Sequence, residues 1–302
     1  MSLATTNRSG QLWWPVLLLL VAACAWAEPR EEASTPAAEG LLFELIAPGG
    51  GPPSWLFGTI HSEDPRVLRL PDAVATALAA ADTLVLEVVP DAASVRIAAG
   101  AMRLPAGTEL RDLLPPETYR RCVEALAARG QPETVLRKLK PWAVMTLLSM
   151  PPARTGDFLD RQLHQVAAAA GKATIGLETT AEQLAVFEQL TPTEQRALLR
   201  AALAAQGERE RLFEALIDAY LRGALGELLA LSDEHASGLT PDLQRRLRHI
   251  LIRSRNARML ERIQALPADQ RYFIAVGALH LPGETGMLAS LKAAGYSVRR
   301  LY

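Results

Sequence analysis

Short hydrophobic runs separated by turn residues mark the first third of the chain. Leu41–Ile46 and Trp55–Phe57 are two such runs, and the glycine- and proline-rich residues 47–53 lie between them, which predicts a β-hairpin. Thr83–Leu86 is a continuous apolar run that ends at Glu87. A run without polar alternation is typical of a strand buried on both faces of a parallel sheet.

The middle of the chain instead carries hydrophobic residues at spacings of three and four, which predicts successive helices. One short strand, Ala173–Leu177, interrupts this pattern, and helices are again expected from Ala181 to Leu266. Thr191-Pro192 and Thr240-Pro241 are typical helix starts within that second stretch. The helices predicted before the strand are Pro116–Arg129, Pro132–Leu139, Pro141–Met150 and Phe158–Ala170.

The end of the chain returns to the pattern of its beginning, with strands at Tyr272–Val276 and Ser297–Leu301 and a helix at Glu284–Ala294. Each end runs from an apolar strand through Gly-x-x-His and a proline-containing loop to a helix and a further strand. Such βαβ units pair in parallel. We therefore expect an α/β fold, with a mostly parallel central sheet built from N- and C-terminal βαβ units. One domain, residues 41–302, would hold a large helical insertion at about 111–266.

Composition excludes several classes of protein. The 302 residues are 49% hydrophobic, enough for a sizeable core, and 32 basic against 33 acidic side chains give no electrostatic reason to expect a nucleic-acid partner. The sequence has no His-Glu-x-x-His helix, Gly-x-Ser-x-Gly elbow or phosphate-binding glycine loop. An ordinary zincin, a serine hydrolase and a P-loop enzyme are therefore not expected.

Residues 1–27 are predicted to be a signal peptide, because the apolar run from Trp13 to Ala23 is short and small residues follow it. Ala25-Trp26-Ala27 allows cleavage before Glu28, whereas Val21-Ala22-Ala23-Cys24 resembles a lipobox in which Cys24 is lipidated. Both alternatives predict export, either to the periplasm or to a membrane as an anchored lipoprotein. Residues 28–40, rich in Glu, Ala, Pro, Ser and Thr, are expected to be a flexible linker.

Two Gly-x-x-His turns, ending at His61 and His280, are the strongest candidates for a functional site. Five histidines and 20 glycines among 302 residues would produce roughly a third of one such spacing by chance. Each turn follows an apolar strand, so its glycine allows a sharp bend or a close approach. The imidazole is then free to bind a metal or to transfer a proton.

Glu87 is the third candidate, because it ends a buried strand one βαβ unit after His61. If these strands are adjacent and parallel, their carboxyl ends converge. A buried carboxylate needs a cation, so Glu87 either joins a metal site, pairs with an arginine or reaches solvent. Two imidazoles and a carboxylate suit Mn, Co, Zn or Fe. His61, His280 and Glu87 are therefore the predicted ligands of a divalent metal.

The chain resembles the TraB/GumN family, part of a Tiki-like metalloprotease superfamily. Gly58-Thr59-Ile60-His61 and Leu84-Val85-Leu86-Glu87 are similar to its opening block, and Val276 to Gly283 to its closing block. Its middle block is similar to Lys140-Pro141-Trp142, Gly176-Leu177-Glu178-Thr179, Glu182-Gln183-Leu184 and Arg255-Asn256. The resemblance implies a metal site at His61 and His280, with Glu87 as ligand or general base.

These observations predict a metal-dependent peptidase that acts on exported peptides or proteins. Arg255 is a candidate for stabilising an oxyanion or a substrate carboxylate, although several arginines on its helix also fit a solvated face. Glu178 ends a short strand and is either a catalytic residue at the same rim or a helix cap. The alternatives are a binding protein that sequesters a peptide or a haem-like ligand, and an accessory factor of the cell envelope.

Overall fold

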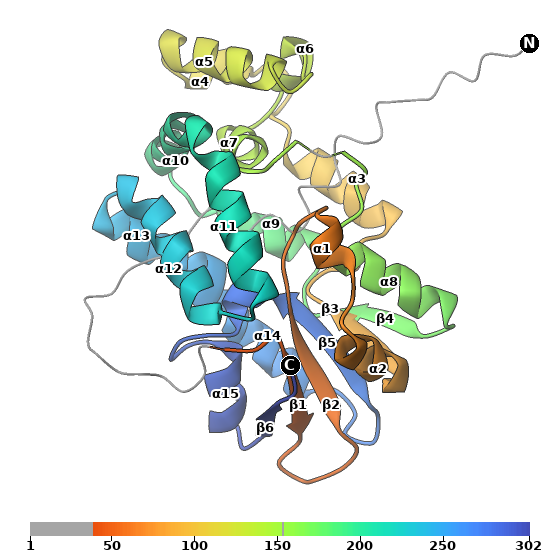
Figure 1. The fold of residues 1–302 in the computed structure, drawn as a ribbon. Helices are drawn as coiled ribbons and strands as arrows, with labels where there is room; N and C mark the ends of the chain where they lie inside the picture. The colour runs from red at the N-terminus through yellow and green to blue at the C-terminus, as the bar shows by residue number, and fades with distance from the viewer. Residues whose placement is uncertain (1–38, 153) are drawn as a thin grey trace, which may run out of the picture.

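A six-stranded sheet with helices on both sides organises the computed structural model, which describes residues 39–152 and 154–302 (Figure 1). The order of its strands is β4-β3-β5-β2-β1-β6. The predicted signal peptide, Cys24 and residues 28–38 of the predicted linker lie outside the described residues. Among the described helices, none has the length and apolar character needed to cross a membrane.

The predicted α/β fold is confirmed, and the sheet is mostly parallel. β1 (Leu42–Ile46) and β2 (Ser54–Thr59) form the predicted antiparallel hairpin. β2, β5 (Tyr272–Gly277), β3 (Thr83–Leu86) and β4 (Ala173–Gly176) then run parallel to one another. β6 (Ser297–Arg300) pairs antiparallel with β1 at the edge.

β5 lies between β2 and β3, the two strands that lead to His61 and Glu87, so those two strands are not adjacent. All six residues of β5 are buried, and an interior place in the sheet gives this strand two hydrogen-bonded neighbours. As a result β5 pairs directly with β2, with Gly58 opposite Val276 and Thr59 opposite Gly277. The two Gly-x-x-His turns therefore begin side by side.

The helices follow the predicted spacing, with boundaries that shift by a few residues. The predicted C-terminal helix starts three residues late, at Met287, because Gly286 is its N-cap. The helices are α1 (Pro65–Leu68), α2 (Asp72–Ala80), α3 (Ala92–Ala101), α4 (Leu110–Leu113), α5 (Pro116–Ala127), α6 (Glu133–Leu136), α7 (Pro141–Ser149), α8 (Leu159–Ala169), α9 (Thr180–Glu188), α10 (Pro192–Ala204), α11 (Arg209–Leu221), α12 (Leu225–His235), α13 (Pro241–Arg248), α14 (Ser254–Gln264) and α15 (Met287–Ala293).

A π-helical segment, His249–Arg253, joins α13 to α14. A π turn adds a residue to the helical repeat, and such turns are frequent at functional sites. Directly after it, α14 buries Arg255 and Asn256 together with two hydrophobic residues, Met259 and Ile263. This helix therefore turns a charged and a polar side chain toward the interior, although most of its arginines remain outside the core.

The buried hydrophobic residues form two clusters. One surrounds the sheet, including Leu56, Leu84 and Phe273, and the other lies among the upper helices of Figure 1, including Trp142 and Leu199. β4 and α8 fall inside the predicted insertion, yet β4 completes the sheet and α8 contacts β3 and β4. The predicted domain, residues 41–302 with a helical insertion at about 111–266, stays a prediction.

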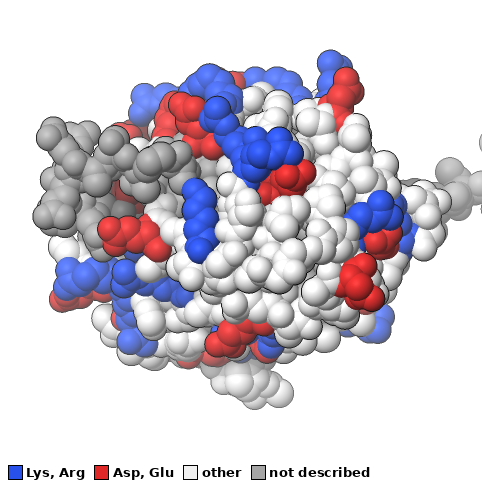
Figure 2. Space-filling view, turned by 90° about the horizontal axis from the view of Figure 1, so that it is seen from below, with Lys and Arg blue, Asp and Glu red and all other residues white. Residues whose placement is uncertain are grey.

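Basic and acidic side chains are intermixed on the lower face of the molecule, where the space-filling view shows them mainly around the rim of a largely uncharged centre (Figure 2). This distribution matches the near balance of 32 basic and 33 acidic residues. The notable charges of this protein are instead those in its interior.

Candidate functional site

Side chains from three parallel strands and one helix gather at the carboxyl edge of the sheet. Glu87 directly follows β3, Glu178 follows β4 by two residues, and His280 lies in the short 3₁₀ turn after β5. Arg255 reaches them from α14. The carboxyl ends of parallel strands are where α/β folds build their sites.

Arg255 is at the centre of this group and has no exposed surface. Its Nη2 donates to Glu87 Oε2 at 2.5 Å and to Glu178 Oε2 at 2.6 Å, and its Nε donates to the same Glu178 oxygen at 2.8 Å. Its Nη1 donates to His280 Nε2 at 3.0 Å. The alternative that placed Arg255 on a solvated helix face is therefore wrong. For Glu87, the arginine-paired alternative is the one present.

The tautomer of His280 follows from its contacts. Asn256 Nδ2 donates to the carbonyl oxygens of His280, at 3.2 Å, and Thr285, at 2.8 Å. These two bonds fix the orientation of the Asn256 amide, and its Oδ1 lies 2.6 Å from His280 Nδ1. Nδ1 therefore carries the proton, and Nε2 accepts from Arg255. Burial, working against the nearby charge of Glu87, lowers the pKa of His280 to about 4, so the ring is neutral at pH 7.

Glu87 is ionised and fully engaged. Its Oε1 accepts from the backbone N–H of Gly277 at 2.7 Å, and its Oε2 accepts from Gln183 Nε2 at 3.0 Å as well as from Arg255. Burial alone would raise the pKa of Glu87, but Arg255, His280 and the Gly277 N–H outweigh it and lower the pKa to about 2. A carboxylate with these partners fixes the positions of its neighbours.

Glu178 is buried and pairs with two arginines. Besides Arg255, it accepts from Arg258 Nη1 at 2.8 Å. Burial nevertheless raises the pKa of Glu178, against the opposing effect of Arg255. It does not cap the next helix: Thr179 is the N-cap of α9 and accepts from the backbone N–H of Glu182. Of the two predicted roles of Glu178, the position at the rim is therefore the one present.

His61 stands at the wall of a cleft of about 450 Å³. Its ring packs against Phe158, with the ring centroids 4.2 Å apart. Its Nδ1 is buried and has no hydrogen-bond partner among the described residues. Burial lowers the pKa of His61 to about 4, although Glu63 and Glu87 act in the opposite direction. At neutral pH this imidazole is uncharged and retains an uncommitted nitrogen.

Asp160 is a buried acid at this edge that the sequence did not single out. The hydroxyl of Thr59, within the first Gly-x-x-His turn, donates to its Oδ1 at 3.1 Å. Burial and the negative charge of Glu87 raise the pKa of Asp160 to about 7. One signal was available: Asp160 shares the buried face of α8 with Leu163 and Ala167, where a charged residue is unusual.

Close packing between the two motifs explains the first glycine. A Cβ on Gly58 would lie 2.7 Å from the Leu281 side chain and 3.2 Å from the Ala278 Cα. The buried Tyr220 hydroxyl also donates to the Gly58 carbonyl at 2.9 Å. The first motif is thus fixed against the second by backbone contact, which a larger residue would prevent.

The predicted metal ligands do not fit a metal ion in this arrangement. Their donor chemistry is suitable, but His280 Nε2 and Glu87 Oε2 both bond to Arg255. In the described ranges, 39–152 and 154–302, no three His, Cys, Asp or Glu side chains gather so as to hold an ion. Arg255 and Arg258 already balance the charges of Glu87 and Glu178. A divalent cation would add uncompensated positive charge to a buried cluster.

Comparison with known proteins finds one matching family and several distant relatives. The sequence model of the TraB/PrgY/gumN family matches residues 45–300. Zebrafish (Danio rerio) "Metalloprotease TIKI2" is 27% identical over 310 residues, which cover 85% of this chain and 60% of that protein. "Uncharacterized protein YbaP" of Escherichia coli (strain K12) is 26% identical over 242 residues, covering 78% and 87%. No solved structure matches significantly.

Proposed function

The chain belongs to the TraB/PrgY/gumN family, and on this basis we propose that it is a peptide hydrolase. The zebrafish relatives named as metalloproteases support protein or peptide substrates. This chain spans about 60% of the length of those relatives, so their activity is carried over as part of the proposal. The observation on which it rests is His61, which lines a cleft and whose buried Nδ1 has no hydrogen-bond partner among the described residues.

The residues of this chain have complementary roles in such a reaction. His61 is neutral at pH 7 and would accept the proton of an attacking water. Arg255 supplies a fixed positive charge in an interior where electrostatic interactions are strong, and Glu87 and Glu178 hold it in place. Asp160, with its pKa near 7, can hold or release a proton close to the first motif.

We further propose that this hydrolysis depends on a divalent metal, although one observation supports a metal and another opposes it. The relatives named as Tiki metalloproteases support a divalent metal, such as Mn, Co, Zn or Fe. The contacts of Arg255 oppose it, because they occupy the donors of His280 and Glu87. Metal analysis of the purified chain beside a His61→Ala/His280→Ala double variant separates the two. Stoichiometric metal that only the double variant lacks would establish the metal site.

Peptide cleavage is the test of the proposed function. The purified chain is incubated with a broad peptide library, and products are read by mass spectrometry. We expect cleavage, and a loss of at least about 100-fold in kcat/KM for His61→Ala, since general-base catalysis contributes about 10²–10⁴-fold. His164→Ala is the matched control, because His164 bonds to Thr174 and belongs to neither motif. No cleavage by the wild-type chain would overturn the proposal.

A peptide-binding protein is the second candidate, and the full engagement of Glu87 and His280 by Arg255 favours it. A cluster whose donors and acceptors are all bonded within the protein can hold a binding surface in shape without catalysing a reaction. Peptides retained by the wild-type chain but never cleaved would support this candidate over hydrolysis.

We also propose that the chain is exported, from the apolar leader and its two cleavage patterns. Intact mass of the membrane-extracted and soluble protein separates the alternatives. A lipid mass on a chain starting at Cys24 supports the anchored form, and a chain starting at Glu28 supports the periplasmic form. A full-length chain would contradict both.

A further inference from the structure

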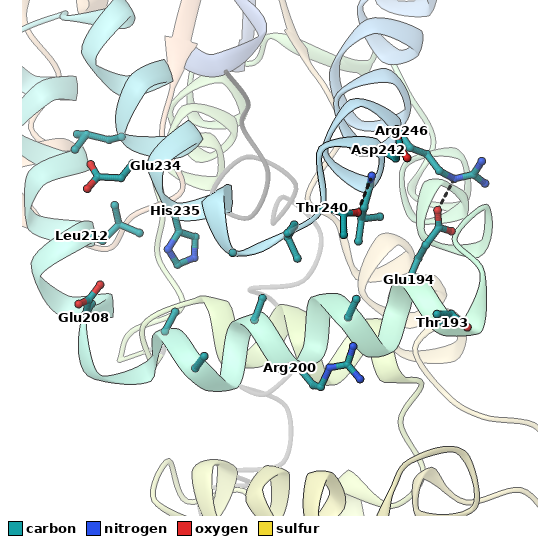
Figure 3. Close-up of a pocket in the computed structure, with 18 of the residues that line it drawn as sticks. Thr193, Glu194, Arg200, Glu208, Leu212, Glu234, His235, Thr240, Asp242 and Arg246 are labelled. Carbon is teal, nitrogen blue, oxygen red and sulfur yellow. Dashed lines mark hydrogen bonds and ion pairs between the residues drawn. The ribbon is translucent and has the colours of Figure 1, made fainter. Parts of the chain in front are cut away.

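Two cavities compete as the place where a ligand would bind. The larger, about 1190 Å³, lies between α10 and the helices α11–α13, and Figure 3 shows His235, Glu208 and Arg200 around it. None of the predicted site residues lines this cavity. The smaller cleft, about 450 Å³, has His61 in its wall. Its size is within the range of roughly 300–1,000 Å³ that is typical of ligand sites.

The floor of the smaller cleft is hydrophobic. Phe158, Phe213, Ile217 and Met150 line it, and each is less than a tenth exposed. Phe213 and Ile217 come from α11, Met150 is the C-cap of α7 and Phe158 is the N-cap of α8. An apolar surface that meets water in a concave site gains free energy when a ligand covers it.

One wall of the cleft is fixed by a carboxylate. Both oxygens of Glu63 accept from consecutive backbone N–H groups, those of Arg154, Thr155 and Gly156, at 2.8, 2.9 and 2.9 Å. These bonds tie the segment before Phe158 to the first Gly-x-x-His loop. The cleft is therefore shaped by protein contacts before any ligand arrives, which lowers the entropic cost of binding.

Four of the six charged residues that line the cleft, Glu63, Asp64, Arg209 and Glu214, have partners within the protein, and the other two, Arg154 and Glu210, are exposed. Asp64 and Glu214 share Arg66, and Arg209 donates to the carbonyl of Leu148 and to Gln206. Together with the bonded Glu63, these side chains offer little to a charged ligand group. We therefore expect the buried apolar residues that line the cleft to decide which ligand side chains bind there.

We infer that the cleft beside His61 is the subsite for a bulky apolar side chain, such as Leu or Phe, of the peptide. This inference rests on the proposed function, because it places that side chain next to the imidazole that would activate water. Phe213 is the main specificity-determining residue, since its large ring lines the cleft from the buried face of α11.

The test uses N-acetylated peptide amides that differ at one position, which carries Leu, Phe, Ala or Asp. We expect the wild-type chain to cleave the Leu and Phe peptides with a KM at least about tenfold below that for Ala and Asp, as apolar pockets discriminate by this order. Phe213→Ala should remove that preference. Equal KM values for all four positions would overturn the inference.

Leu212→Ala is the matched control, because Leu212 is the neighbour of Phe213 on α11 and lines the other cavity (Figure 3). It should keep the preference for Leu and Phe. If Phe213→Ala does not fold, Phe213→Trp, which fills the cleft, should raise the KM of the bulky peptides selectively. An unchanged preference in Phe213→Trp would contradict the assignment.

Binding of the same peptides, labelled with a fluorophore and followed by anisotropy in a His280→Ala variant, separates this inference from the proposed function. Selective binding of Leu and Phe peptides without any wild-type cleavage would support the subsite and reject the hydrolase. Cleavage of all four peptides without selective binding would support the hydrolase and reject the subsite.

Discussion

Arg255 has no exposed surface, and two carboxylates and an imidazole share its guanidinium. Arg255→Met would leave Glu87 and Glu178 buried with fewer positive partners. We therefore expect a loss of about 3–5 kcal/mol in the free energy of unfolding, the usual cost of breaking a buried ion pair. Urea denaturation followed by circular dichroism measures it.

Arg258→Met is the control for this prediction, because Arg258 contacts the same Glu178 but its side chain is 30% exposed. Its loss should cost about 1 kcal/mol or less. Equal effects of the two substitutions would contradict the central position of Arg255.

The raised pKa of Asp160 predicts that the free energy of unfolding depends on pH in an unusual way. Its pKa is about 7 in the folded chain, against an ordinary value of 3.8, because it is buried and close to Glu87. The folded state therefore holds the proton more tightly, so this stabilisation is complete below pH 3.8 and is lost as the pH rises through 7. The free energy of unfolding of Asp160→Asn, relative to that of the wild type, should therefore increase as the pH rises from 5 to 8.5.

Urea unfolding at these two pH values provides the measurement. Asp157→Asn, a change of an exposed acid just before the same helix, should show no such trend. A difference between wild type and Asp160→Asn that stays constant with pH would reject the raised pKa.

The sequence indicated Glu87, Arg255, Glu178 and His280 because each follows a strand or belongs to a motif. Their shared contacts could not be predicted, since the distance between Arg255 and His280 depends on how α14 packs against the end of β5. Asp160 was missed for a related reason. Its partner Thr59 is 101 residues away in the sequence, and no local pattern connects them.

The element that brings the two motifs together is β5, which pairs with β2 rather than extending one edge of the sheet. Hydrophobic periodicity predicted both strands but not their order, because a fully apolar strand fits several interior positions. The π-helical segment before Arg255 could likewise not be predicted, since the spacing of the surrounding leucines is that of one long α-helix.

Gly58→Ala tests this pairing. The added Cβ would meet Leu281 at 2.7 Å and Ala278 at 3.2 Å, so the two motifs would have to separate. We expect a loss of about 1–3 kcal/mol in the free energy of unfolding, as for overpacked sites. Gly49→Ala, which adds a Cβ into open space in the β1–β2 turn, is the control. A neutral Gly58→Ala would contradict the close contact of the motifs.

At the scale of the whole molecule, the site joins residues from nearly the full length of the chain. The fold class and the family were predictable from the sequence, because strand patterns and motif residues are local signals. Which side chains meet was not, because helices from the middle of the chain supply Asp160, Gln183 and Arg255. Another helix from the middle of the chain, α11, lines the cleft in which we place the substrate.

The most direct test of the account is the coupling between the two motifs in peptide hydrolysis. We compare kcat/KM for His61→Ala, for His280→Ala and for the double variant, with folding checked by circular dichroism. Residues that act as one catalytic unit are strongly non-additive, so the double variant should lose no more than the more damaging single change. Losses that multiply, or activity that survives both substitutions, would contradict a single site built from both turns.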